Sequence, residues 1–129
     1  MTNELPEEVE SLLAGERLVA YLATCNDGRP HVAPVWYRCA DDVLEVVTTG
    51  RKLDNLRENP RVSLSLQRGA ATSPDWTATL LGTATVIDDE DASREANRRI
   101  NRKYGVAEDR WEENVLVRIR IGSVATRMY

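Results

Sequence analysis

Two segments of the sequence alternate between apolar and polar residues, and this alternation limits what the chain can fold into more than any other feature. Residues 61–67 read RVSLSLQ, and residues 115–121 read VLVRIRI. Successive side chains of a strand point to opposite faces, so each segment would place its apolar side chains on one face and its polar ones on the other. We therefore expect both to be half-buried strands of an antiparallel sheet.

Four further segments have the composition and the flanking turn residues of strands. They are residues 18–24, 31–38, 43–49 and 76–87, the last with a kink at Gly82. The first three are predicted to form a meander, with turns at 26–30 and at Asp41-Asp42. Residues 68–75 are predicted to be a loop, and residues 123–129 to be extended or frayed.

Three segments have the apolar spacing of helices, and together with the six strands they predict a mainly β fold. They are Asn3–Ala14, Lys52–Asn59 (stopped by Pro60) and Asp88–Tyr104, in which Ala92, Ala96 and Ile100 would face inward. No internal repeat or linker interrupts the chain, and its length suits one core. We expect a single domain over residues 1–129, built as a small closed or nearly closed antiparallel barrel.

Charge and hydropathy exclude several functions. The chain carries 17 Lys and Arg against 21 Asp and Glu, for a net charge of -4. A nucleic-acid-binding protein normally needs a basic face. No apolar run approaches the roughly 20 residues of a membrane span, and the first ten residues are acidic, unlike a secretory signal. We expect a cytoplasmic protein that binds neither nucleic acid nor membranes.

The residues that most often carry chemistry are scarce. Cys25, His31 and Cys39 are the only cysteines and histidine, whereas structural zinc usually takes four such ligands. We expect two reduced thiols and no metal. Paired acids occur only in predicted turns and loops, where they are ordinarily solvated, so acid–base catalysis by the protein's own side chains is not indicated. A cofactor would carry any reaction.

Residues 48–52, Thr-Thr-Gly-Arg-Lys, join a predicted strand to a predicted helix. Thr48 and Thr49 bring hydroxyls, Arg51 a bidentate fork and Lys52 a point charge. The free N–H groups and the dipole of a helix N-terminus also favour an anion. This segment predicts a phosphate site, the alternative being that its two cations merely begin an exposed helix.

A second candidate lies on the predicted strand 31–38. Pro34 within a strand indicates an edge, a bulge or an open hydrogen-bond ladder. An open ladder at Pro34, Val35 and Trp36 would leave backbone groups free to bind a planar heterocycle whose phosphate reaches residues 48–52. In the alternative, Val35 and Trp36 are ordinary core and surface residues of a strand.

Residues 27–66 read DGRPHVAPVWYRCADDVLEVVTTGRKLDNLRENPRVSLSL. This run resembles the flavin-binding split-barrel family of pyridoxamine 5′-phosphate oxidase and the related proteins that bind the deazaflavin coenzyme F420. Three motifs carry the resemblance in combination: G-x-P-x-x-x-P-V-W, T-x-x-R-K and N-L-x-x-N-P-R-V. It is densest over residues 18–67 and extends more loosely through 76–87 and 115–121.

The resemblance implies a six-stranded antiparallel split β-barrel with flanking helices, which forms a homodimer with two cofactor sites at the subunit interface. Exposed apolar strand faces such as that of residues 115–121 would need the cover that a second subunit provides. By position, the phosphate would lie at Thr48, Thr49, Arg51 and Lys52, the isoalloxazine ring at Pro34, Val35 and Trp36, and Gln67 would reach the cofactor, commonly that of the partner subunit. Further second-subunit contacts would be Trp76, Trp111 and Arg127.

The chain also departs from that family's pattern. Pyridoxamine 5′-phosphate oxidase proper is longer and ends in a Trp/Arg/His-bearing segment, whereas this chain ends VLVRIRIGSVATRMY. We therefore do not expect that activity. The basic strand position that the true oxidases use for the flavin phosphate is apolar or aromatic in VAPVWY, as in the deazaflavin and general-oxidoreductase branches. The choice between FMN and F420 stays open.

The leading functional hypothesis is an FMN-dependent oxidoreductase that transfers a hydride between flavin N5 and a small molecule. In the second, F420 replaces FMN, and its acidic tail favours a cationic groove for which Arg17, Arg29 and Arg57 are candidates. A third is a flavin-binding module without turnover, for storage, electron relay or sensing. In a fourth, no cofactor binds, and Arg51 and Lys52 affect surface charge alone.

Overall fold

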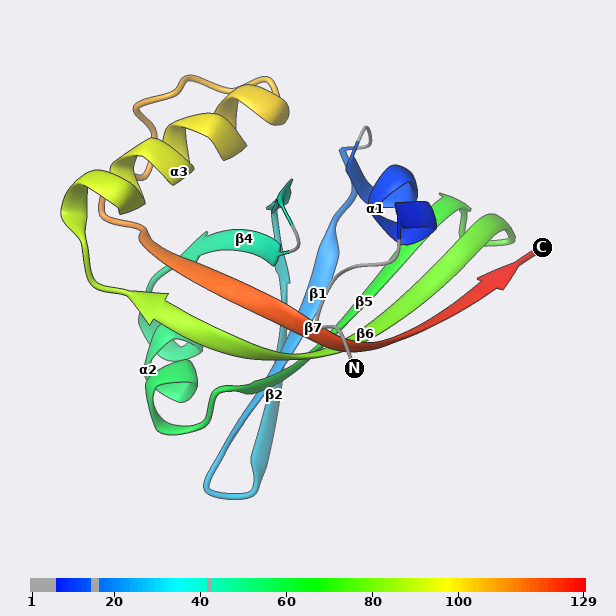
Figure 1. Ribbon diagram of the computed structural model, residues 1–129, viewed down its shortest axis with the longest axis horizontal. Coiled ribbons are helices and arrows are strands. Elements are labelled where there is room, and N and C mark those ends of the chain that lie inside the picture. The colour runs from blue at the N-terminus through cyan, green and yellow to red at the C-terminus, as the bar shows by residue number, and fades with distance from the viewer. Residues whose placement is uncertain (1–6, 15–16, 42) are drawn as a thin grey trace.

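The computed structural model describes residues 7–14, 17–41 and 43–129 (Figure 1). Residues 3–6 of the first predicted helix and Asp42 of the predicted turn lie outside the described residues. The helices are α1 (Glu7–Ala14), α2 (Gly50–Glu58) and α3 (Glu90–Lys103). The strands are β1 (Ala20–Asn26), β2 (Arg29–Val35), β3 (Tyr37–Ala40), β4 (Val43–Thr48), β5 (Arg61–Ala70), β6 (Ser73–Ile87) and β7 (Val115–Met128). No described helix has the length and apolar character needed to cross a membrane.

All seven strands form one antiparallel sheet in the order β2-β1-β5-β6-β7-β4-β3. Its two edge strands, β2 and β3, are consecutive in the chain and are separated by Trp36 alone. In a flat sheet these edges would lie roughly 29 Å apart, at about 4.8 Å per strand, whereas one residue spans about 3.5 Å. The sheet therefore has to curl until its edges meet, as Figure 1 shows. The predicted mainly β, barrel-like fold is confirmed, with seven strands rather than six.

The predicted strand 31–38 is two strands, and the predicted meander is therefore two hairpins, β1–β2 and β3–β4. The chain leaves the ladder at Trp36, so that β2 pairs with β1 at one edge of the sheet and β3 pairs with β4 at the other. Pro34 is nevertheless paired in register with Tyr21. It is tolerated there because β2 is an edge strand, whose outer side needs no partner.

The predicted loop 68–75 is also wrong. β5 and β6 continue through it as a hairpin that turns at residues 71–72, with an irregular register between Arg68 and Gly69. β7 likewise stays paired with β6 out to Met128, and a second register shift at Leu81 and Gly82 marks the expected kink. Most side chains at the hairpin's tip are exposed on both faces, so no burial pattern in the sequence reveals these strands.

The core fills the inside of the curled sheet. The alternation of residues 61–67 is confirmed, because Val62, Leu64 and Leu66 are buried. Val117, Ile119 and Ile121 are buried in the same core, whereas Leu116 is buried outside this cluster and Val115 is half-buried. The expectation that this face needs a second subunit as cover is therefore wrong. Trp76 is 1% exposed and belongs to this core as well.

Two helices flank the sheet beside its closure. α2 contacts β1, where the buried Asn55 amide donates a 3.1 Å hydrogen bond to the buried Thr24 hydroxyl. α3 packs over β7 and β4, with Ala96 and Ile100 buried as predicted and Ala92 half-buried. The face of α3 that packs on the sheet also carries the buried amides of Asn97 and Asn101, which hydrogen-bond the loop that follows the helix.

Candidate functional site

A cleft of about 480 Å³ opens where the sheet closes, between the β2–β3 break, the end of β4 and the inner side of α3. It is lined by Val19, Pro34, Val35, Trp36, Val47, Thr48, Thr49, Lys52, Ile100, Asn101, Trp111 and Asn114. We call it the Trp36 cleft. Six of the eight residues predicted to bind a cofactor line it, and they come from two chain segments that the closure of the sheet brings together.

The anion-attracting end of the Trp36 cleft lies at the β4–α2 junction. Thr49 is the N-cap of α2, but its side chain makes no capping hydrogen bond, so the first backbone N–H groups of the helix have no side-chain acceptor there. Gly50 turns the chain in the left-handed region, at φ +69°. Lys52 adds an ammonium group, and no acidic residue is among those lining the cleft. This end can therefore hold a phosphate.

The structure separates Arg51 from Lys52. Arg51 is exposed and lines a neighbouring hollow of about 520 Å³, together with Arg29, His31 and Asp54. Because consecutive helical residues point in different directions, the predicted Arg-Lys pair reaches two adjacent hollows rather than one point. A ligand bound in the cleft can place its phosphate at Lys52. To reach Arg51 as well, it would have to extend across the start of α2 into the neighbouring hollow.

Gln67 does not line the Trp36 cleft of its own chain. It is exposed on β5, where its amide donates a 3.2 Å hydrogen bond to the carbonyl of Ala70. Its predicted role, reaching the cofactor of a partner subunit, stays a prediction. Arg127 is likewise exposed, near the end of β7.

Two aromatic side chains, Trp36 and Trp111, line this cleft, and a third, Tyr104, packs behind Trp36. The rings of Trp36 and Tyr104 are stacked, with centroids 4.5 Å apart and planes 3° apart. Trp111 meets Trp36 edge-on, at 5.7 Å and 79°. Trp111 thus belongs to the cleft of its own chain, which the sequence did not indicate. Tyr104 was missed as well, because only tertiary packing brings the end of α3 against the β2–β3 break.

The backbone groups freed at the break are satisfied by the end of α3. The Tyr37 N–H donates to the hydroxyl of Tyr104 (3.3 Å), which itself donates to the carbonyl of Leu18 (2.6 Å). The Lys103 ammonium donates to the Tyr37 carbonyl (2.9 Å) and lies 3.7 Å from the Tyr37 ring centroid. Burial lowers the pKa of Lys103 to about 8 and raises that of Tyr104 to about 12. These contacts fix the wall of the cleft at Trp36.

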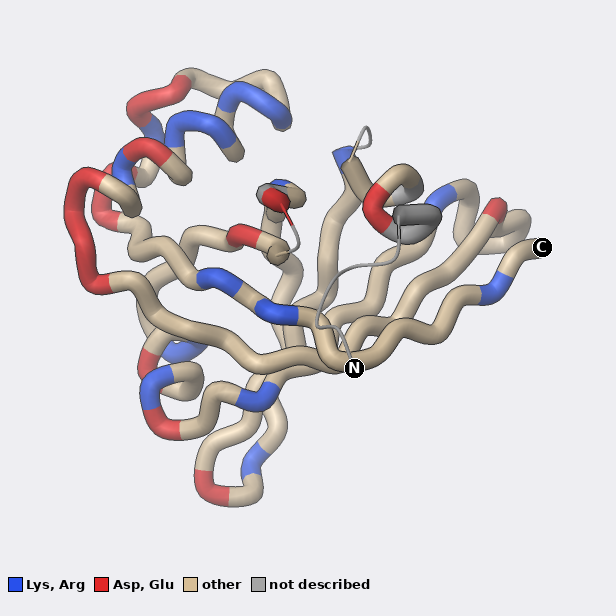
Figure 2. The backbone as a smooth tube through the Cα atoms, in the orientation of Figure 1, with Lys and Arg blue, Asp and Glu red and all other residues tan. Residues whose placement is uncertain are grey.

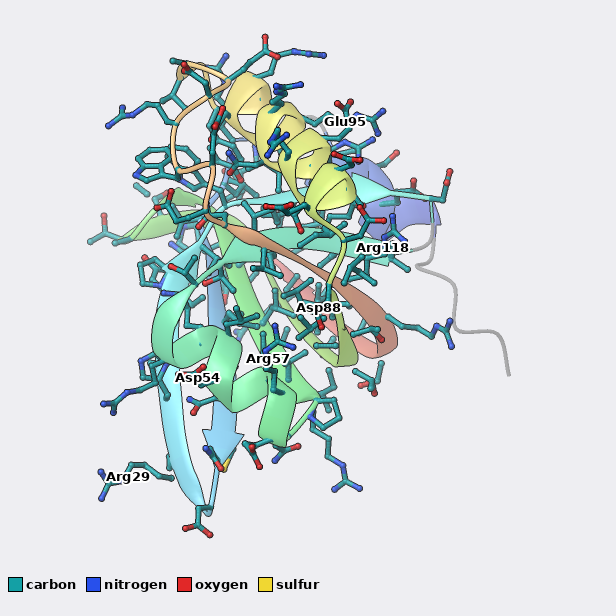
Figure 3. All side chains as sticks on the ribbon, turned by 90° about the vertical axis from the view of Figure 1, so that its left-hand side faces the viewer. Arg29, Asp54, Arg57, Asp88, Glu95 and Arg118 are labelled. Atoms are coloured by element: carbon teal, nitrogen blue, oxygen red, sulfur yellow. The ribbon has the colours of Figure 1, made fainter. Side chains whose placement is uncertain are left out.

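The three arginines predicted to form a cationic groove have different surroundings. Arg57 is held by Asp88 through two hydrogen bonds of 2.7 and 3.0 Å, from α2 to the end of β6 (Figure 3). Arg29 projects near the tip of the β1–β2 hairpin, away from that pair (Figure 3). Arg17 is exposed before β1. Of the three, Arg29 alone lines the hollow beside the Trp36 cleft.

Cys25 and Cys39 are free and half-buried. Burial raises the pKa of the Cys39 thiol to about 11, which leaves it protonated and a poor nucleophile at neutral pH. Within the part of the chain that the structure describes, no group of three or more His, Cys, Asp or Glu side chains could hold a metal ion.

Comparison with known proteins supplies the context for this geometry. The family model for pyridoxamine 5′-phosphate oxidase matches residues 5–127. The uncharacterized protein RA0666 of Rhizobium meliloti (strain 1021) is 35% identical over 66 residues, which are 50% of this chain and 43% of that protein. The chain thus matches less than half the length of this curated relative.

Two solved structures share the fold across nearly the whole chain. An FAD-binding protein from Mesorhizobium loti is 24% identical with a TM-score of 0.76, covering 97% of this chain and 96% of its own. An F420 reductase is also 24% identical with a TM-score of 0.76, covering 94% of this chain and 98% of its own. At this identity, the likeness concerns the fold.

Proposed function

The chain belongs to the pyridoxamine 5′-phosphate oxidase family, and from this premise we propose that the Trp36 cleft binds a flavin-type cofactor, FMN in the first instance, for oxidoreductase chemistry. One observation carries the proposal. The cleft joins an apolar, aromatic end at Pro34, Val35 and Trp36 to an anion-attracting end at Thr49 and Lys52. A flavin mononucleotide has the same two parts, a flat conjugated ring and a phosphate.

The residues present fit such a ligand electrostatically. Lys52 and the uncapped start of α2 favour a phosphate dianion, and no carboxylate lines the cleft to oppose it. The hydroxyl of Thr49 lies beside them as a further donor. At the other end, the edge strand β2 has backbone groups on its outer side that can hydrogen-bond the polar rim of the ring.

A bound flavin would supply two-electron hydride transfer through its N5 atom to a small molecule. The protein's part is to hold the phosphate, orient the ring and exclude water from its apolar face. The cleft offers no histidine or carboxylate as a proton donor, in keeping with chemistry carried by the cofactor. The same arrangement suits a flavin-binding module without turnover. A steady-state assay with NAD(P)H as electron donor distinguishes this module from an oxidoreductase, because only the oxidoreductase would turn over.

F420 is the alternative cofactor, and one observation favours it. The hollow beside the cleft carries Arg29 and Arg51, opposed by the single carboxylate of Asp54. F420 has acidic groups beyond its phosphate, which FMN lacks. A ligand lying across the start of α2 could place its phosphate at Lys52 and these further acidic groups at the two arginines.

We also propose that the chain forms a homodimer, through what we call the neutral face of the sheet. Eleven exposed or half-buried positions, paired in register across five strands, carry no charge. They are Tyr21, Ala23, Val32, Pro34, Ser63, Ser65, Thr77, Thr79, Leu81, Ser123 and Ala125. Figure 2 shows that β1 carries no charged residue along its length and that most of the charged positions lie on the helices and loops.

A symmetric dimer places a patch against its own copy, which an uncharged surface tolerates and a surface of one charge does not. Charged residues make up 29% of the chain, so eleven neighbouring positions without a charge support a protein partner. Arg127, which is paired with Thr77, lies at the rim of this face. Pro34 lies both on the neutral face and in the Trp36 cleft. A second copy would therefore stand at the edge of the cleft.

The experiment that tests the cofactor proposal is retention during gel filtration. The purified protein is mixed with FMN or with F420, and the absorbance of the ligand is followed through the column. Co-elution of FMN supports the leading proposal, and selective co-elution of F420 supports the alternative. If neither ligand elutes with the protein, cofactor binding by this cleft is wrong.

A further inference from the structure

The side chain of Trp111 does not behave as a core residue. It is 41% exposed, although tryptophan is usually largely buried. Its backbone has φ +58°, a left-handed conformation that bulky residues rarely adopt. Such a conformation persists where the surrounding structure imposes it, commonly at sites that bind ligands. Here the exposed indole lines the Trp36 cleft.

Buried amides of α3 impose this loop conformation. Asn97 and Asn101 are 0% and 1% exposed. The side-chain amide of each donates to the carbonyl of Arg110, at 2.7 and 3.0 Å, and that of Asn101 also donates to the carbonyl of Glu108 at 3.2 Å. Two buried side chains thus converge on the residue immediately before Trp111.

The loop is fixed on the other side of Trp111 as well. The Asn114 side chain donates a 3.1 Å hydrogen bond to the side-chain oxygen of Asn97, and the Asn114 N–H donates to the Trp111 carbonyl at 3.0 Å. We call Asn97, Asn101 and Asn114 the amide clamp. Burying a side-chain amide costs free energy unless it is hydrogen-bonded. The two buried amides of α3 meet this condition by bonding the backbone of the loop that carries Trp111.

We propose that Trp111 is a ring-binding wall of the Trp36 cleft, which selects ligands with a flat conjugated ring, and that the amide clamp positions it. This inference rests on the proposed function for the identity of the ligand, but it concerns a different part of that ligand, the ring rather than the phosphate. Lys52 would bind the phosphate, and Trp111 would contact the ring. Arg110, whose guanidinium lies 4.3 Å from the centroid of the Trp111 ring, covers the indole without filling the cleft.

Riboflavin and FMN separate these two determinants because they share the ring and differ in the phosphate. Affinities are measured by flavin fluorescence for wild type, Trp111→Ala, Trp111→Phe and, as a control in the same loop, the exposed Glu112→Ala. We expect Trp111→Ala to weaken riboflavin and FMN by the same factor, about tenfold for the loss of an aromatic ring contact. Trp111→Phe should retain most of the affinity, and Glu112→Ala should bind as wild type does. Unchanged riboflavin affinity in Trp111→Ala would overturn the inference.

The clamp is tested by Asn97→Ala and Asn101→Ala, with two variants used because either amide is buried and its loss can destabilise the fold. Thermal melting identifies which variant remains folded at the assay temperature. A folded clamp variant should lose part of the near-ultraviolet circular dichroism that arises from the Trp36–Trp111 contact, and should weaken riboflavin and FMN in equal proportion. An unchanged spectrum and unchanged affinities would show that the amides do not position Trp111.

Failure of this inference is distinguishable from failure of the proposed function. If wild type binds neither flavin but binds F420, the same variants are titrated with F420, and Trp111→Ala is again expected to weaken binding. If wild type binds none of the three ligands, the proposed function is wrong and the inference falls with it. If wild type binds a ligand and Trp111→Ala binds it equally well, the inference alone is wrong.

Discussion

The indole of Trp36 and the phenol ring of Tyr104 are stacked, with centroids 4.5 Å apart. Trp36 is the single residue between the two edge strands of the sheet, and Tyr104 is the C-cap of α3. Their contact therefore joins the closure of the sheet to α3, the helix that carries Asn97 and Asn101 of the amide clamp. The Trp36 cleft lies at this junction, so the folding event that closes the sheet also assembles the candidate site.

The hydrogen bond between Asn55 and Thr24 should stabilise the docking of α2 on β1. Replacing Asn55 by Ala leaves the buried Thr24 hydroxyl without this donor, and we expect a loss of about 1–3 kcal/mol in the free energy of unfolding. Urea denaturation measures the loss. Glu58→Ala, an exposed change on the same helix, is the control. Equal stability of Asn55→Ala and wild type would contradict a structural role for this bond.

The free energy of unfolding should depend on pH in a way that reflects the lowered pKa of Lys103. Burial lowers the pKa of Lys103 from 10.5 to about 8, so the folded chain releases this proton at a lower pH than the unfolded chain does. Between these values the unfolded state binds more protons, and the contribution of Lys103 to the free energy of unfolding rises with pH. Below about pH 8 that contribution is unfavourable and constant.

Two neighbours titrate in the opposite sense. Burial raises the pKa of Cys39 to about 11 and that of Tyr104 to about 12, so their contributions fall as pH rises through the alkaline range. Comparison with Lys103→Met, which keeps both groups, isolates the lysine. We expect the stability of wild type relative to Lys103→Met to stay constant below about pH 8 and to increase between about pH 8 and pH 10.5, the folded and unfolded pKa values of Lys103. A difference that stays constant would contradict the lowered pKa.

The dimer should be sensitive to a charge placed on the neutral face. Ser65 is exposed near the middle of that face, paired with Tyr21 on one side and Thr79 on the other. In a symmetric dimer, Ser65→Glu brings a carboxylate into an uncharged interface, and we expect dissociation to monomers in light scattering. Thr85→Glu, an exposed change on β6 outside the neutral face, should leave the dimer intact. A monomeric wild type at micromolar concentration would contradict the proposed homodimer.

The sequence predicted those parts of the fold in which one strand face is buried. Residues 61–67 and 115–121 have one apolar face each, and both are strands with that face in the core. The hairpin at residues 68–75 was missed because it is held by the backbone ladder with few buried side chains. The break at Trp36 was missed because the residues before it pair with β1 and those after it pair with β4, at opposite edges of the sheet. The order of all seven strands determines these two pairings, and no local pattern reveals it.

The candidate site was predicted in part for the same physical reason. Residues 34–36 and 48–52 carry local signals, a proline in a strand and cations at a helix start. Trp111 carries none, because it lies in a polar loop and reaches the cleft only through hydrogen bonds from α3. The separation of Arg51 from Lys52 follows from the direction of each side chain around α2, which the motif alone does not specify.

The most direct test of the central claim is the affinity of the Trp36 cleft for FMN in wild type and in Lys52→Ala, with Arg98→Ala on the exposed side of α3 as the control. Loss of a charge-assisted phosphate contact should cost about 1.5–3 kcal/mol, a decrease in affinity of roughly 10- to 150-fold. Riboflavin, which lacks the phosphate, should bind Lys52→Ala as it binds wild type. An FMN dissociation constant that is the same in Lys52→Ala and wild type would contradict the assignment of this cleft as the cofactor site.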